Sequence, residues 1–189
     1  MVKAANVSPE SRASDIKAYG LNAVVHRGWY AVMQGNYDEG MNAFQQALKT
    51  YEIVGSLLHI PLLMNLIAET YLRMDKIEEG LKTTESAFER LSSIETRAFM
   101  PELHRIRGEL LLKSPTHTRT EGIAALEKAL NMAQDMSAKS LELRAAMSLY
   151  RAQGETAHPL LASVYNWFTE GLDTTDLVAA RTLLTNGKT

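Results

Sequence analysis

The chain has 189 residues, of which 46% are hydrophobic and 22% charged, which is typical of one globular domain with a sizeable core. Its formal net charge of −2 provides no basic excess to neutralise phosphates, and its lack of cysteine excludes disulfides and thiolate sites. No apolar run is long enough for a membrane span, and residues 1–15 lack the apolar stretch of a signal peptide. We therefore expect a cytoplasmic protein that binds neither nucleic acid nor membrane.

Apolar residues at helical spacing, separated by turn-forming residues, predict helices along the whole chain. Ser8 before Pro9 predicts the N-cap of the first helix, and Thr174 and Thr175 after Gly171 announce the last. The helices are expected near residues 9–33, 37–53, 58–74, 77–92, 99–113, 120–136, 138–152, 157–169 and 174–186.

Small residues recur along the chain with a period of about 40 residues. A glycine inside a helix costs about 1 kcal/mol relative to alanine, so close packing must compensate for it. The pattern therefore predicts that the two helices of each unit approach closely. The recurring residues are Gly28, Ala68 and Gly108 in the first helices, and Gly40, Gly80 and Gly122 at the start of the second helices.

This periodicity predicts an all-α chain in which helix pairs stack in a row. We expect a single domain over residues 1–189, with an irregular fourth unit because terminal repeats are atypical. The expected units span residues 9–55, 56–95, 96–137 and 138–170, followed by a closing helix at 174–186.

Residues 35–48 resemble the second half of a tetratricopeptide repeat. The matching positions are Gly35, Tyr37, Phe44 and Ala47. Gly40 and the 40-residue period depart from the usual pattern of about 34 residues, which implies longer helices. The resemblance implies a right-handed tetratricopeptide-like superhelix, an α-α solenoid of about four helix pairs plus a terminal helix.

A second resemblance covers about residues 20–186 and is carried by residues 102–112, 138–146 and 164–171. Together they look like the C-terminal helical-repeat region of large bacterial multidomain proteins. Those proteins carry a class III adenylate/guanylate cyclase domain or a DNA-binding activator domain, then a signalling ATPase. The resemblance implies a regulatory role and not their catalysis, because the chain has no Gly-x-x-x-x-Gly-Lys-Ser/Thr phosphate-binding loop.

In tetratricopeptide stacks the first helices line a concave groove, so the resemblance also implies where a partner binds. Arg73, Arg105 and Arg151 can hold carboxylates with paired hydrogen bonds, and Trp29 can anchor an apolar side chain. The simpler alternative is that Arg105 only pairs with glutamates of its own helix on a solvated face. The partner-binding candidates are Asn22, Val25, Trp29, Asn65, Glu69, Arg73, Glu102, Arg105 and Glu109.

We therefore expect a non-catalytic domain that binds a peptide, a protein or a neighbouring domain and so regulates an attached enzyme. The alternative is a sensor with a small-molecule effector between the arms of the solenoid, and the third hypothesis is an enzyme that uses Glu102, His104 and Arg105. The histidines lack metal-ligand spacing, so no metal or cofactor is expected. Exposed aromatic residues among Tyr165, Trp167 and Phe168 would mark an interface, and a homodimer is left open.

Overall fold

The computed structural model describes residues 9–55, 59–91 and 97–186, and the side chains from residue 21 to residue 185 within them. These ranges are helical apart from short turns, which confirms the all-α prediction. The predicted cap Ser8 lies outside the described residues. The helices are α1 (Pro9–Met33), α2 (Tyr37–Ile53), α3 (His59–Arg73), α4 (Ile77–Leu91), α5 (Met100–Lys113), α6 (Arg119–Asp135), α7 (Lys139–Gln153), the 3-10 turn η1 (Gly154–Ala157), α8 (His158–Tyr165) and α9 (Thr175–Asn186).

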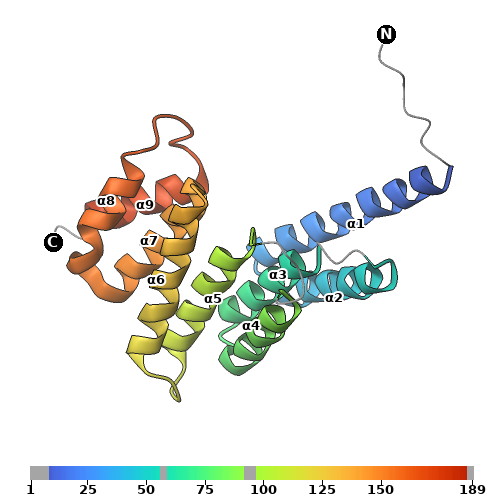
Figure 1. Ribbon diagram of the computed structural model, residues 1–189, viewed down its shortest axis with the longest axis horizontal. Coiled ribbons are helices and arrows are strands. Elements are labelled where there is room, and N and C mark those ends of the chain that lie inside the picture. The colour runs from blue at the N-terminus through green and yellow to red at the C-terminus, as the bar shows by residue number, and fades with distance from the viewer. Residues whose placement is uncertain (1–8, 56–58, 92–96, 187–189) are drawn as a thin grey trace, which may run out of the picture.

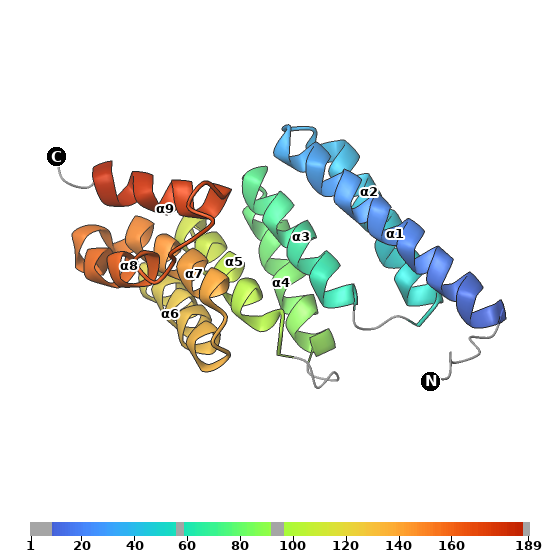
Figure 2. The ribbon, with the colours of Figure 1, turned by 90° about the horizontal axis from the view of Figure 1, so that it is seen from above.

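Consecutive helices pack as pairs, and the pairs lie side by side in a row (Figures 1 and 2). The pairs are α1 with α2, α3 with α4, α5 with α6, and α7 with α8. The odd-numbered helices also contact one another in sequence, from α1 to α3, α5, α7 and α9. We call the surface that α1, α3, α5, α7 and α9 form the odd-helix face. The right-handed superhelix and the division into repeat units stay predictions.

The turns after α1 and α3 have the same geometry. Gly35 and Asp75 adopt the left-handed conformation, with φ of 83° and 58°. The following amides, of Asn36 and Lys76, each donate to a carbonyl five residues back at 2.9 Å. This hydrogen bond and a left-handed residue are typical of a helix C-terminus that reverses direction, so both pairs close by the same local device.

Glycines allow close packing within the first and third pairs. A Cβ on Gly28 would lie 2.8 Å from Cβ of Ala43, and one on Gly108 would lie 2.7 Å from Leu126, which confirms the predicted close approach. Gly80 differs, because its Cβ would meet Leu110 of α5 and not its own partner helix. In the second pair, the glycine on α4 therefore allows close packing against α5 of the neighbouring pair.

α8 is shorter than the predicted helix at 157–169, because it ends at Tyr165. The amides of Trp167 and Phe168 donate three residues back, at 3.3 and 3.1 Å, so the chain continues as tight turns. Phe168 packs with the C-terminal core and lines a hollow with Leu177 of α9. Trp167 stays 59% exposed and packs edge-on against Phe168.

Buried aliphatic and aromatic side chains form the core along the whole row of pairs. Phe44, Leu103, Leu110, Leu126 and Leu161 are each completely buried. Within the part of the chain that the structure describes, no helix has the length and apolar character needed to cross a membrane.

Candidate partner-binding groove

A buried arginine organises the middle of the odd-helix face. Arg105 of α5 is only 5% exposed and is held by three carboxylates. Its Nη2 donates to Glu69 Oε2 at 2.6 Å and to Glu102 Oε1 at 2.7 Å, and its Nη1 donates to Glu109 Oε1 at 2.7 Å. Its Nε donates to Glu102 Oε2 at 3.1 Å, so Glu102 binds the guanidinium with both oxygens.

This polar cluster extends across the neighbouring helices. Arg73 Nη2 lies 3.1 Å from Glu69 Oε1, and its guanidinium lies 5.4 Å from the ring centroid of Trp29 on α1. On the other side, Arg144 Nη2 of α7 lies 2.9 Å from Glu102 Oε1. Arg144 Nε lies 4.0 Å from Asp176 Oδ2 of α9. Ion pairs and a cation–π contact therefore connect all five helices of the face.

Burial and the neighbouring charges shift the pKa values of Glu69 and Arg105 in opposite directions. Burial alone would raise the pKa of Glu69, but Arg105 and Arg73 outweigh it and lower that pKa below its usual value. Burial alone would lower the pKa of Arg105, but Glu102, Glu69 and Glu109 raise it well above its usual value. Both groups therefore stay charged, and the ion pairs compensate for their burial.

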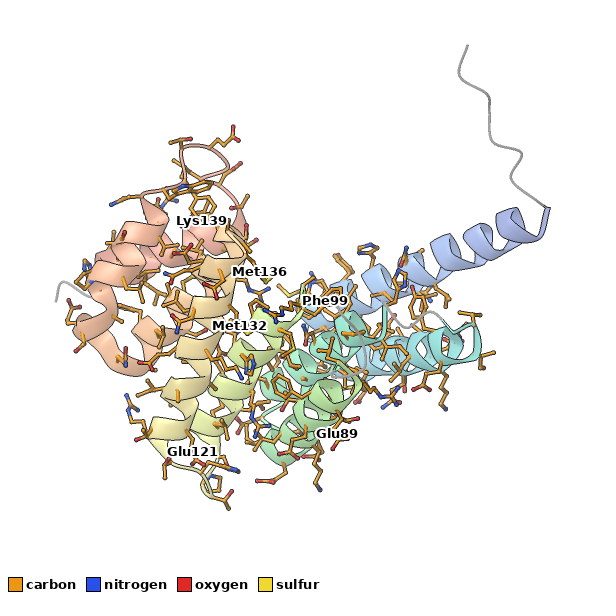
Figure 3. All side chains as sticks on the ribbon, viewed as in Figure 1. Glu89, Phe99, Glu121, Met132, Met136 and Lys139 are labelled. Carbon is orange, nitrogen blue, oxygen red and sulfur yellow. The ribbon has the colours of Figure 1, made fainter. Side chains whose placement is uncertain are left out.

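A mainly apolar hollow of about 390 Å³ lies next to the cluster, and we call it the apolar hollow. Asn65 lies in its wall and donates from Nδ2 to the carbonyl oxygen of Phe99 at 3.2 Å. Figure 3 shows Phe99 where α5 begins. Asn65 Oδ1 is buried and has no hydrogen-bond partner in the described structure, so it is an unused acceptor. The lining residues are Trp29, Leu62, Asn65, Leu66, Glu69, Ala98, Phe99, Glu102, Ile106, Leu141 and Arg144.

A second hollow of about 370 Å³ adjoins the first, because Glu69 and Arg144 line both. We call it the cationic hollow, since five basic and three acidic side chains line it. Arg151 in this wall forms no ion pair or hydrogen bond with another described residue. The charged lining residues are Arg73, Arg105, Lys113, Arg144, Arg151, Glu69, Glu109 and Asp176.

Most of the residues predicted for the groove line these hollows, and two do not. Val25 is only 7% exposed because it packs in the core against α2, and Asn22 accepts a hydrogen bond from the Tyr51 hydroxyl at 2.9 Å. The predicted residues that line the hollows are Trp29, Asn65, Glu69, Arg73, Glu102, Arg105 and Glu109.

Sequence reasoning missed Arg144, Ser148 and Asp176. Arg144 follows Arg105 by 39 residues, and Ser148, whose hydroxyl donates to Glu109, follows that glutamate by 39. A repeat period shortened by one residue would have found both. Asp176 lies on the closing helix and has no equivalent in the repeat, so no periodic signal indicates it.

The structure corrects two hypotheses from the sequence, one about the surroundings of Arg105 and one about a catalytic set that includes it. The predicted ion pairs of Arg105 with Glu102 and Glu109 are present, but Arg105 is buried and does not lie on a solvated face. Its guanidinium is already occupied by this chain's own carboxylates, so it is not free to grip a ligand. The suggested catalytic set of Glu102, His104 and Arg105 does not converge, because His104 lines a different hollow from the other two.

The described part of the chain holds no cluster of three or more histidine, aspartate or glutamate residues suited to a metal ion. Comparison of the chain with known protein families and with curated proteins finds no match. The tetratricopeptide and cyclase-associated resemblances therefore stay predictions from the sequence.

Proposed function

We propose that this chain is a non-catalytic interaction domain that binds an extended peptide segment on its odd-helix face. The segment would belong to a partner protein or to a neighbouring domain. The observation that carries the proposal is that the apolar and cationic hollows adjoin and share Glu69 and Arg144 as walls. Together they make an elongated site with one apolar half and one basic half.

The ion-pair cluster makes this site suitable for binding because it is ordered before a partner arrives. Arg105 is buried and fixed by three carboxylates, and Arg144 is held by Glu102. Side chains that are already fixed lose little conformational entropy on binding. The cluster thus acts as the rigid floor of the groove.

The remaining groups define the peptide's chemistry. An apolar side chain fits against Trp29, Leu62 and Phe99 in the apolar hollow. Arg151, which is exposed, can pair with an acidic side chain of the peptide. A partner segment with an apolar residue close to an acidic one therefore matches both halves.

The second candidate is a small-molecule effector in place of a peptide. It is favoured by one observation, that Trp29 and Arg144 line the same hollow of about 390 Å³, a size suited to small ligands. In either case, the sequence resemblance suggests that the domain forms the regulatory end of a bacterial cyclase or ATPase signalling protein.

A peptide-display selection against the intact chain tests the proposal. We expect the selected peptides to contain an apolar and an acidic residue. Arg151→Met should lower the affinity of these peptides about tenfold, because a charge-assisted hydrogen bond is lost. Arg27→Met is the matched control, since Arg27 is exposed on α1 and lines neither hollow. Peptides that bind Arg151→Met and the unchanged chain equally would refute the assigned groove. A bound effector would instead be released by denaturing the purified protein and detected by mass spectrometry.

A further inference from the structure

Another hollow, of about 570 Å³, lies between α4, α5 and α6, apart from the odd-helix face. We call it the histidine hollow, because His104 of α5 lines it. Phe88, Met100 and Leu111 form its apolar surface. Figure 3 shows Glu121, another lining residue, at the beginning of α6 beside the α5–α6 turn. None of these residues belongs to the proposed peptide groove.

The histidine hollow has two cations in its lining, Lys128 and Arg107, of which Lys128 is unpaired among the described residues. Lys128 forms no ion pair or hydrogen bond with another described residue. Arg107 lies over the Phe88 ring and donates from Nη1 to the Thr84 hydroxyl at 3.4 Å. It is also 3.5 Å from Glu85, whose side chain is 59% exposed, so solvent screens that ion pair. The acidic lining residue Glu121 already accepts from the backbone N–H and the hydroxyl of Thr118, at 2.7 and 2.8 Å.

His104 adds a polar group with unused hydrogen-bonding capacity. The residue is only 7% exposed, its ring centroid lies 4.6 Å from that of Phe88, and its Nε2 has no partner in the described structure. Burial, together with Lys128 and Arg107, lowers the pKa of His104 to about 4, so the ring is neutral at neutral pH. A neutral imidazole still offers one N–H donor.

We propose that the histidine hollow binds a small amphipathic monocarboxylate. The carboxylate would lie between Arg107 and Lys128, and the apolar chain would lie against Phe88, Met100 and Leu111. Three observations favour this class of ligand together. Part of the lining is apolar, Lys128 has no described partner while the ion pair of Arg107 is screened by solvent, and the buried His104 Nε2 has no hydrogen-bond partner.

Octanoate is the probe that tests this site, with octanol as the uncharged ligand of the same chain length. The titration uses the full chain and follows binding by calorimetry and by the NMR signals of the His104 ring. We expect octanoate to bind about tenfold more tightly than octanol, since the cations recognise only the acid. Saturation with octanoate should also shift the His104 ring signals, because the carboxylate arrives next to the ring.

Lys128→Met removes one cation while keeping the length of the side chain, and Lys128 is exposed, so the fold is retained. This change should lower the affinity for octanoate about fivefold or more and leave the affinity for octanol unchanged. Lys82→Met is the matched control, because Lys82 is exposed on α4 and does not line the hollow. It should leave both affinities unchanged.

Three results would overturn the proposal. Octanol that binds as tightly as octanoate would show that the hollow does not recognise an acid. If Lys128→Met left the octanoate affinity unchanged and octanoate did not shift the His104 ring signals, octanoate would bind elsewhere on the protein. The absence of octanoate binding at millimolar concentration would exclude the site. None of these outcomes bears on the peptide groove, which Arg151→Met tests separately.

Discussion

Arg105 Nη2 lies 2.6 Å from Glu69 Oε2, and this ion pair joins α5 to α3 beneath the odd-helix face. The two side chains are 7% and 10% exposed, so water contributes little to stabilising either charge. Two more carboxylates, from Glu102 and Glu109, bind the same guanidinium. Each charge therefore depends on its partners, and removal of one side chain leaves the others uncompensated.

Replacing Arg105 with methionine should destabilise the fold by about 3–5 kcal/mol, because Glu69, Glu102 and Glu109 would face one another without a cation. Urea unfolding followed by circular dichroism measures the loss. Adding Glu69→Gln to Arg105→Met should recover part of it, since one of the opposing charges disappears. Arg27→Met, on the exposed surface of α1, should change stability by less than about 0.5 kcal/mol. An Arg105→Met protein as stable as this control would contradict the prediction.

Gly108→Ala should destabilise the protein by about 1–2 kcal/mol, although alanine is the better helix former. The new Cβ would lie 2.7 Å from Cγ of Leu126, a completely buried residue, and 3.0 Å from the carbonyl oxygen of Gly122. Gly80→Ala is the matched comparison, because the three atoms nearest its Cβ all belong to the Leu110 side chain and none to the backbone. Thermal unfolding should show a clearly lower Tm for Gly108→Ala than for Gly80→Ala, and equal values would show that this close approach is not limiting.

The free energy of unfolding should fall as the pH decreases from about 6.5 towards about 4, partly because of His104. Burial, Lys128 and Arg107 lower its pKa to about 4 from the usual 6.5, so in this window the unfolded chain binds a proton that the folded chain does not. The contribution is about 1–2 kcal/mol once solvent screening is allowed for. His104→Gln should flatten this part of a stability–pH curve.

His26→Gln controls for this experiment, because His26 is exposed on α1. Its curve should follow that of the unchanged chain. Glu69, whose pKa is lowered, gives a separate loss of stability only below about 4.5, and so acts at the acid end of the curve. If His104→Gln and His26→Gln gave the same curve between about pH 4 and 6.5, the buried neutral state of His104 would be disproved.

Thr118→Ala should loosen the beginning of α6 and cost about 1 kcal/mol. The Thr118 hydroxyl accepts from the Glu121 backbone N–H at 3.3 Å, and the Glu121 carboxylate accepts from the Thr118 N–H at 2.7 Å. Both bonds satisfy amides that have no partner inside the helix. Amide hydrogen exchange should accelerate in the first turn of α6. Thr120, two residues after Thr118, is exposed, and Thr120→Ala should leave the exchange rates unchanged.

The sequence by itself determined the helices, because their signals are local. Apolar spacing and turn residues such as Gly35 predicted the helix positions to within a few residues along most of the chain. The 40-residue recurrence of small residues also predicted the close contact of Gly28 and Gly108 with their partner helices. It placed Glu69, Arg105 and Glu109 on one face, since equivalent positions of stacked helices lie near one another.

Only the tertiary structure decided what those residues do. Burial and charge compensation depend on neighbours that are distant in the sequence. The sequence therefore did not reveal that Glu69 of α3 pairs with the buried Arg105, or that Arg144 of α7 pairs with Glu102. The same reason explains Val25, which the tetratricopeptide resemblance and the 40-residue period placed in the groove but which packs in the core. Arg105 faces the groove and the neighbouring His104 lines another hollow, because α5 packs against α3 and α7 as well as against α4 and α6.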